Sequence, residues 1–242
     1  MYREGLNTVK MAKKLNVCPS TINSILIKRK EPIRDYAEKR RKYSLNQEFF
    51  DVIDTEEKAY ILGLIYSDGC NEENHRTISI TLHVKDKYLL ERVMQIMNSA
   101  RPLRIPPKLN VAIFNITSKK MSARLAELGC VQAKSLILKF PSNDIVPDHL
   151  FRHFLRGCSD GDGCMHIQKN AKRLTWSIVG SCDFISGLQN KLISLFGLKG
   201  CSQNIGNVKS LSYGGSRQAC KISEYMYKDA TIFMQRKYDK YM

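Results

Sequence analysis

Two stretches of the chain alternate strictly between apolar and polar residues. Residues 77–83 read TISITLH and residues 173–179 read RLTWSIV, so that every second side chain is a large apolar one. A period of two predicts a β-strand with one buried face and one solvent-facing face. The solvent-facing positions are polar and include no acid: Thr77, Ser79, Thr81 and His83 in the first stretch, and Arg173, Thr175 and Ser177 in the second.

The order of elements around these strands occurs twice, with an offset of about 94 residues that is set by Asp68 and Asp162. In each copy we expect an apolar helix, two strands, a second helix, two further strands and a closing helix. The helices are expected at 54–68, 86–97 and 120–129 in the first copy, and at 147–162, 183–197 and 218–227 in the second.

This order predicts an α+β protein built from two pseudo-symmetric αββαββα halves. The least regular part is residues 101–110, RPLRIPPKLN, which contain three prolines and are typical of a loop. We divide the chain into residues 1–46, residues 47–145 as the first half, and residues 146–242 as the second half.

The first helix of each half, which we call a motif helix, ends in an acid followed by glycine. The first motif helix contains ILGLIYSDG (61–69) and the second contains FLRGCSDGDG (154–163). A carboxylate in the last turn faces the negative end of the helix dipole, which disfavours it by about 0.3–1 kcal/mol. A chain that places an acid there twice therefore raises the question of what offsets the cost.

Convergence of the two acids offers an answer. Gly63 and Gly157 occupy the same place in the motif helices, and small residues allow two helix backbones to approach closely. If the motif helices pack together, Asp68 and Asp162 meet and form an oxygen-rich site for hard divalent cations. Two such ions beside a phosphodiester can activate water and stabilise the leaving oxygen. One copy could be an ordinary Asp-Gly turn, but two copies in matching contexts favour a metal-dependent nuclease.

The charge of the chain supports a polyanionic partner. The net charge is +16, from 39 Lys and Arg against 23 Asp and Glu. Nucleic acid is the first expectation and an anionic membrane surface the second, but the apolar run 59–66 is far shorter than the ~20 residues of a membrane-spanning helix. The opening residues do not resemble a secretory signal, so we expect a cytoplasmic protein. The eight cysteines form no CxxC pair, which predicts neither a zinc module nor a disulfide framework.

Half of the excess charge lies in residues 1–46, which carry twelve Lys or Arg and four Asp or Glu. Within them, residues 8–30 predict two short helices around a turn at Asn16, with Pro19 opening the second helix. Val9, Ala12 and Leu15 would form one apolar stripe. A second stripe is expected from Ile22, Ile25 and Leu26.

These two helices resemble a helix-turn-helix. A helical hairpin used only for packing is the alternative, and the basic runs 28–30 and 38–43 favour DNA binding. The second helix would present Ser20, Thr21, Asn23, Ser24 and Lys28 to a major groove, and the basic runs would add phosphate contacts through Arg29, Lys30, Arg40, Arg41 and Lys42.

The two acid-ended motifs, ILGLIYSDG and LRGCSDGDG, resemble the two signatures of a single-chain LAGLIDADG homing endonuclease. The resemblance covers roughly residues 48–242. It implies two pseudo-symmetric halves whose curved sheets form a saddle over DNA, with the motif helices at the interface. It departs from the family pattern at Tyr66, which replaces the other acid of the first motif, whereas Asp160 retains that acid in the second. The polar residues Arg156, Cys158 and Ser159 predict a looser helix interface.

The resemblance also implies roles for individual residues. Asp68 and Asp162 would bind two or three Mg²⁺ ions, helped by the main-chain carbonyls of Ser67 and Gly161. Lys119 would be a base or phosphate contact near the cut, and Arg217 would match it in the second half. The polar strand residues given above would face the major groove.

We therefore expect a site-specific, Mg²⁺-dependent double-strand DNA endonuclease that acts as a monomer with internal pseudo-two-fold symmetry. Double-stranded DNA is the expected partner, with no membrane and no protein partner implied. Two alternatives stay open at this point. One is an RNA-binding intron maturase, and the other is a non-catalytic DNA-binding regulator of the same fold. The regulator would be favoured by loss of either acid, and both acids are present.

Overall fold

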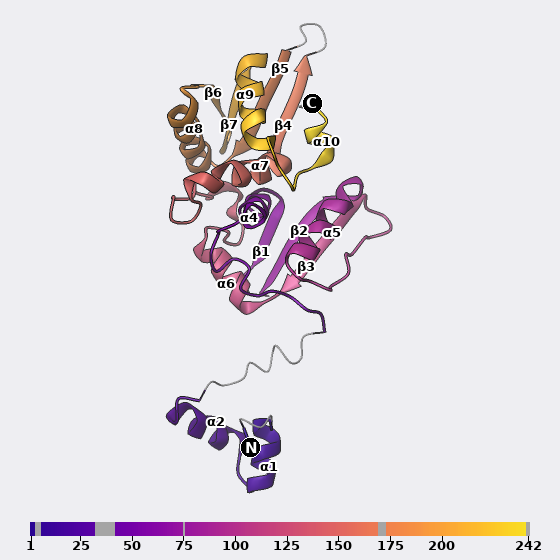
Figure 1. Cartoon of the computed structure of the whole chain (residues 1–242), viewed down its shortest axis with the longest axis vertical. Helices are drawn as coiled ribbons and strands as arrows, with labels where there is room; N and C mark the ends of the chain where they lie inside the picture. Colours follow the sequence, from indigo (N-terminus) through magenta and orange to yellow (C-terminus); the bar gives the residue numbers. More distant parts are fainter. Residues whose placement is uncertain (3–5, 32–41, 75, 169–172, 241–242) are drawn as a thin grey trace. The chain divides into compact units, whose positions relative to one another are not determined.

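The structure is a computed structural model, and it describes residues 1–2, 6–31, 42–74, 76–168 and 173–240. The chain divides into two compact units, Met1–Lys42 and Tyr43–Met242. The larger unit holds both predicted halves (Figure 1).

The smaller unit contains two helices, α1 (Thr8–Leu15) and α2 (Pro19–Lys28). Asn16 ends α1 in the left-handed conformation with φ of 51°, and Pro19 opens α2, as the sequence predicts. Tyr2, Ala12, Ile22 and Leu26 form its core.

The predicted stripes of this unit are only partly correct. Val9, Leu15 and Ile25 are exposed, although each was expected to lie on a buried face. The reason is geometric, because two short helices that cross bury a single line of contact, which Ala12, Ile22 and Leu26 already fill.

The first half of the larger unit contains a three-stranded antiparallel sheet in the order β1-β2-β3. Its strand β2 coincides with the predicted stretch and alternates between buried and exposed side chains. The elements are α4 (Glu56–Asp68), β1 (Gly69–Glu72), β2 (Thr77–His83), η1 (Val84–Asp86), α5 (Lys87–Ile96), β3 (Val111–Thr117) and α6 (Lys119–Glu127).

The second half contains a four-stranded antiparallel sheet in the order β4-β5-β7-β6. Residues 128–150, which we call the linker, precede this half and contain η2 (Lys134–Leu136) and η3 (Asp148–Leu150). The elements are α7 (Phe151–Asp162), β4 (Gly163–Gln168), β5 (Arg173–Gly180), α8 (Cys182–Phe196), β6 (Cys201–Ile205), β7 (Val208–Gly214), α9 (Ser216–Tyr227) and α10 (Gln235–Tyr238).

The two halves differ in one predicted strand. The first half replaces the counterpart of β6 by a single bridge between Arg104 and Ile113. Prolines at 102, 106 and 107 lack the N–H that a strand ladder needs, which explains why this segment stops at one bridge. The α+β class and the two-half arrangement are confirmed, and the αββαββα order is complete in the second half only.

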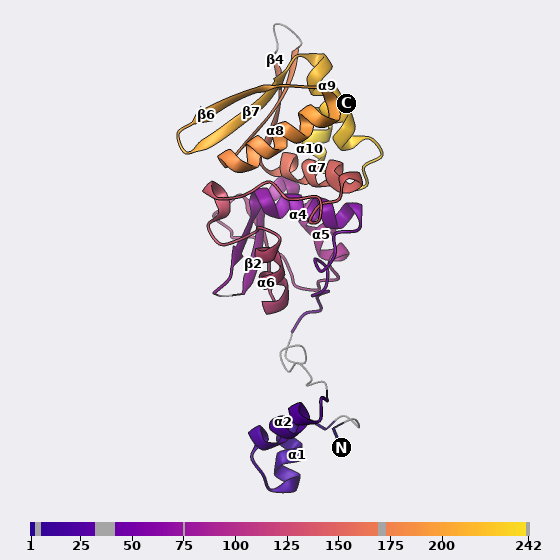
Figure 2. The same cartoon turned by 90° about the vertical axis from the view of Figure 1, so that its left-hand side faces the viewer.

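The motif helices α4 and α7 lie side by side between the two sheets (Figures 1 and 2). A Cβ added to Gly63 would lie 2.1 Å from the Phe154 carbonyl oxygen, and one added to Gly157 would lie 2.1 Å from the Tyr60 carbonyl oxygen. Backbone therefore meets backbone at both positions, and the predicted role of the two glycines is confirmed. Both helices belong to one continuous hydrophobic core. Among the residues that the structure describes, we find no helix of the length and apolarity that crossing a membrane requires.

The helix contact can be tested through Gly63→Ala. We expect this change to lower the free energy of unfolding by about 3 kcal/mol, because the new methyl group would overlap main-chain atoms that cannot rotate away. Gly180→Ala is the control, since its Cβ would approach only the ends of the Phe184 and Ile185 side chains, at 3.2 Å and beyond. Urea denaturation measures the free energy of unfolding of both variants. Equal stability of the two would contradict the close packing of α4 and α7.

Candidate metal and DNA-binding site

The two predicted acids meet at one end of the helix pair. Asp68 is the last residue of α4, and Asp162 is the last residue of α7. A Cβ added to Gly161 would lie 2.0 Å from Ser67 Oγ and 3.0 Å from Asp68 Oδ2, so the ends of the helices touch. The sequence prediction that Asp68 and Asp162 converge is confirmed by this geometry.

The surroundings of the acids oppose their ionisation. Burial and the neighbouring charge of Asp162 together raise the pKa of Asp68 to about 6 from its usual value of 3.8. Partial withdrawal from water also raises the pKa of Asp162. A site that disfavours two carboxylate charges in this way gains free energy when a cation enters.

Two buried lysines flank the acids, and sequence reasoning did not single them out. Lys134 Nζ donates to the carbonyl oxygen of Gly69, just past α4. Lys237 Nζ donates to the carbonyl oxygens of Ser159, Gly161 and Gly163 at 2.7, 3.0 and 2.7 Å. Both lysines lower the pKa of Asp68 and of Asp162. They satisfy carbonyls at the negative ends of the helix dipoles, where cations are favoured.

The only sequence signal for these lysines is that each follows the closing helix of its half. Lys134 comes shortly after α6, and Lys237 comes shortly after α9, the helix that closes the other half. The prediction had instead named Lys119 and Arg217. Lys119 begins α6 and Arg217 lies in the first turn of α9, and both are exposed. Their catalytic role stays a prediction. Lys134 and Lys237 lower the pKa of both carboxylates, and Arg236 also lowers that of Asp68.

The donor atoms at the helix ends fit Mg²⁺. They are two carboxylates and main-chain carbonyls, and Mg²⁺ is usually held by one or two carboxylates together with water and substrate phosphate. Among the described residues, no group of three or more His, Cys, Asp and Glu could hold a metal ion, so any ion here would rely on non-protein ligands as well. The Gly161 carbonyl accepts from Lys237, so its predicted role as a metal ligand requires sharing with that ammonium. The Ser67 carbonyl stays a prediction.

The acid that only the second motif keeps is structural. Asp160 is fully buried and accepts hydrogen bonds from Tyr60 OH, Tyr227 OH and the Met234 N–H, each at 2.7 Å. Burial raises the pKa of Asp160, and these three donors act in the opposite direction. Since Tyr60 lies on α4, Asp160 joins the two motif helices. At the equivalent place in α4, the Tyr66 hydroxyl donates to the Leu128 carbonyl oxygen.

The predicted loosening of the helix interface is wrong. Arg156 is fully buried and donates to Glu56 Oε1 of α4 at 2.6 Å and to the Ile232 carbonyl at 2.9 Å. Ser159 accepts from the Trp176 indole at 2.8 Å. Arg156 thus ties α7 to α4 and to the end of the chain, and Ser159 ties it to β5.

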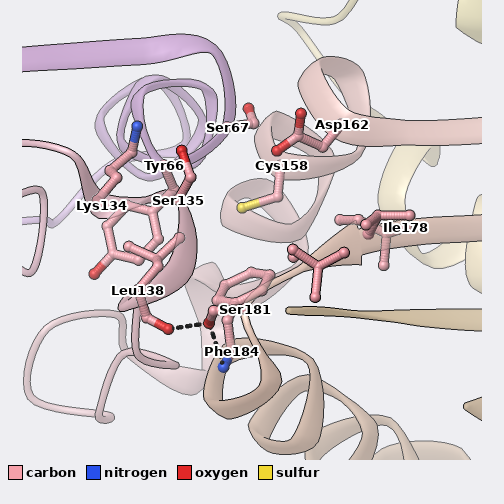
Figure 3. Close-up of a pocket in the computed structure, with 13 residues that line it drawn as sticks. Tyr66, Ser67, Lys134, Ser135, Leu138, Cys158, Asp162, Ile178, Ser181 and Phe184 are labelled. Carbon is pink, nitrogen blue, oxygen red and sulfur yellow. Dashed lines mark hydrogen bonds between the residues drawn. The ribbon is translucent and has the colours of Figure 1, made fainter. Parts of the chain in front are cut away.

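A cavity of about 270 Å³ opens beside Asp162, between the linker and the second sheet (Figure 3). Lys134 and Ser135 lie on one side of it, and Asp162 and Cys158 lie on the other. A second depression on the first half is lined by Asp68, Cys70 and Thr81 and shares Lys134 with the first. The acids therefore border open space on both sides.

The predicted DNA-facing strand residues share one face in each sheet. In the first half, Thr77 and Ser79 are half-buried, while Thr81 and His83 are exposed. In the second half, Thr175 and Ser177 are half-buried, and Arg173 begins β5 with a side chain outside the described residues. Pairing with β3 and β7 adds Asn115 and Ser212 to these faces.

The predicted DNA-binding residues of the smaller unit are mostly on its surface. Asn23 is half-buried, and Arg40 and Arg41 lie outside the described residues. The exposed members are Ser20, Thr21, Ser24, Lys28, Arg29, Lys30 and Lys42. Contact of these residues with DNA stays a prediction.

Comparison with known proteins gives a clear answer for the fold only. No protein-family model and no curated protein sequence matches the chain. The structure of the meganuclease I-AabMI bound to uncleaved DNA is similar with a TM-score of 0.52 and 16% identity, over 75% of this chain and 86% of that chain. The homing endonuclease I-LtrWI bound to target DNA gives a TM-score of 0.53 and 12% identity, over 81% and 88% of the two chains.

A third similar structure is I-SmaMI bound to an uncleaved DNA target with calcium ions, at a TM-score of 0.51 and 14% identity, over 78% of this chain and 89% of that chain. At such identities the likeness concerns the backbone and not the sequence. The chain thus has the fold of the LAGLIDADG homing endonucleases.

Proposed function

We propose that the chain is a site-specific double-strand DNA endonuclease that depends on Mg²⁺. The observation that carries this proposal is the meeting of Asp68 and Asp162 across the α4–α7 contact, with Asp68 made a weaker acid by burial and by its neighbour. The net charge of +16 supports a nucleic-acid partner. The similar structures given above are DNA complexes of LAGLIDADG enzymes, and a further similar structure is I-SmaMI bound to cleaved DNA.

The pseudo-symmetry of the chain supports cleavage of both strands by one molecule. Each half supplies one acid and one lysine to the helix ends, so a single copy already holds two equivalent sets of groups. The sheets supply two polar faces for a duplex that lies across both halves. We therefore propose a monomer that acts on double-stranded DNA.

Each group at the site has a role that follows from its chemistry. Asp68 and Asp162 would bind the metal through their carboxylates, which must be ionised to do so. Bound Mg²⁺ would supply Lewis acidity that activates water and stabilises the leaving oxygen. Lys134 and Lys237 hold the terminal carbonyls of the helices in place and offset the charge of the two acids. Their positive charge would also favour the approach of a phosphate.

The smaller unit would add affinity without taking part in the chemistry. Its exposed cations Lys28, Arg29 and Lys30 are suited to phosphate contacts, which orient a protein on DNA but carry no sequence information.

Selection of cleaved sequences from a random duplex library in the presence of Mg²⁺ tests the whole proposal. A defined recovered site supports it, and binding to intron RNA with no cleavage of DNA would favour the maturase instead.

Replacement of one acid tests the metal site. We expect Asp162→Asn to reduce the rate of cleavage by at least about a hundredfold, because it removes a charged metal ligand. Binding to the selected duplex should persist, since phosphate and base contacts remain. Asp144→Asn, at an exposed acid of the linker, is the control and should cut normally. Cleavage by Asp162→Asn at the control rate would contradict the proposed role of Asp162 as a metal ligand.

The pH dependence of stability tests the electrostatics. The pKa of Asp68 is raised to about 6 in the folded chain, so the folded state holds its proton more tightly than the unfolded state. This contribution to stability is fully present below about pH 4 and is lost as the pH rises through 6. At pH 7.5 without metal, Asp68→Asn should therefore raise the melting temperature by roughly 2–8 °C, which corresponds to about 1–3 kcal/mol.

At pH 4 the same change should have little effect, because Asp68 is then protonated. Added Ca²⁺ should stabilise the unchanged chain at pH 7.5 and leave Asp68→Asn unaffected. Thermal unfolding followed by circular dichroism provides both comparisons. A variant that is less stable than the unchanged chain at pH 7.5 would refute the electrostatic argument.

Salt dependence tests the smaller unit. Replacement of Lys28, Arg29 and Lys30 by Gln should reduce the slope of log affinity against log salt by about 0.9 for each phosphate that these cations neutralise, hence by up to about 3. The recovered cleavage site should keep its central base pairs. Fluorescence anisotropy at several salt concentrations measures the slope, and an unchanged slope would show that these cations do not contact DNA.

A further inference from the structure

The end of the chain, residues 228–240, which we call the C-terminal segment, is fastened to the second motif helix. The Met234 N–H donates to Asp160 at 2.7 Å, and the Ile232 carbonyl accepts from Arg156 at 2.9 Å. Ile232 and Met234 are buried in the core. The segment therefore has a fixed path along α7.

The same segment then reaches the first half. The Gln235 N–H donates to Tyr88 OH at 2.5 Å, and Arg236 Nε donates to the two carboxylate oxygens of Asp86 at 2.9 and 3.2 Å. The Asp86 side chain is 3% exposed and that of Arg236 is 53% exposed. A buried carboxylate of the first half is thus neutralised by an arginine of the second half.

The next residue is Lys237, which donates to three carbonyls at the end of α7. Arg236 and Lys237 lie in one short helix, α10. Because adjacent residues of a helical turn move together, the ion pair that Arg236 makes with the first half constrains where Lys237 can be.

The linker makes the corresponding connection in the other direction. It carries Lys134, which donates to the Gly69 carbonyl, and then its Leu138 carbonyl accepts from Ser181 Oγ of the second half (Figure 3). Ser181 is the N-cap of α8, and Asp86 is the N-cap of α5, its counterpart in the repeat. The halves therefore contact each other at the start of both second helices, α5 and α8, and each contact involves a residue close in sequence to Lys237 or Lys134.

We propose that Asp86 and Arg236 are positioning residues whose ion pair across the two halves holds Lys237 at the end of the second motif helix. Lys237 is then in place only while the C-terminal segment is fastened to the first half. The effect on cleavage rests on the proposed function, whereas the placement of Lys237 does not.

Asp86 is the suitable residue to change. Among the described residues, its side chain forms no capping hydrogen bond for α5, so Asp86→Asn removes the ion pair and leaves the cap as it is. Ser181 is less suitable, because its hydroxyl also accepts from the Phe184 N–H and caps α8.

The experiment measures lysine acylation of the full chain by an N-hydroxysuccinimide ester, followed by mass spectrometry. In the unchanged chain, the buried Lys134 and Lys237 should react slowly and the exposed Lys228 quickly. Asp86→Asn and Arg236→Gln should each raise the acylation rate of Lys237 about tenfold, since loss of a pair of this kind shifts an opening equilibrium by about one decade or more. Lys134 should not change, and Arg236→Lys should restore protection of Lys237.

Asp148→Asn is the matched control. It removes an ion pair between Asp148 Oδ1 and Lys191 Nζ, which are 2.6 Å apart, and both residues are distant in sequence from Lys134 and Lys237. It should leave both acylation rates unchanged. Continued protection of Lys237 in Asp86→Asn and Arg236→Gln would overturn the proposal. A joint rise for Lys134 and Lys237 would also overturn it, because that pattern indicates general loosening of the fold.

Single-turnover cleavage provides a second readout. Asp86→Asn should reduce the cleavage rate about tenfold and leave the affinity for the duplex within about twofold of the unchanged chain. A loss of affinity with an unchanged cleavage rate would contradict the positioning role. If the unchanged chain cuts no DNA, the proposed function fails, and the acylation rates alone decide whether Asp86 and Arg236 position Lys237.

Discussion

The close contact between α4 and α7 determines most of what the larger unit can do. Gly63 and Gly157 let the two backbones touch, with no space for a Cβ on either side. Because the contact brings the helices together along their length, it also brings their last residues together. Asp68 and Asp162 are neighbours for that reason, and the raised pKa of Asp68 follows from its burial and from the charge of Asp162.

This arrangement concentrates negative charge, and lysines from outside the two helices partly neutralise it. Two acids and the negative ends of two dipoles lie in one small volume, and Lys134 and Lys237 satisfy the exposed carbonyls there. Buried Arg156 and Asp160 act differently, because their hydrogen bonds tie the helices to each other and to the C-terminal segment.

The sequence reveals the local parts of this structure well. Alternation predicted the bounds of β2 as observed. The repeated Asp-Gly motif identified the two acids, and the matching positions of Gly63 and Gly157 predicted the helix contact, because each of these signals lies within one element. The lysines were missed because their proximity to the acids depends on where long connections return. Arg156 was misjudged for a similar reason, since its partners Met226 and Ile232 lie about 70 residues further along the chain. The exposure of Val9 and Ile25 shows the same limit within a small unit.

We propose that α4 and α7 together form a divalent-cation site on a DNA-binding face. Anomalous diffraction from Mn²⁺ in crystals of the chain with its selected duplex tests this claim most directly. The account predicts an anomalous peak between the carboxylates of Asp68 and Asp162, within bonding distance of a DNA phosphate. A well-ordered complex with no peak there, or with the ion bound to other residues, would contradict it.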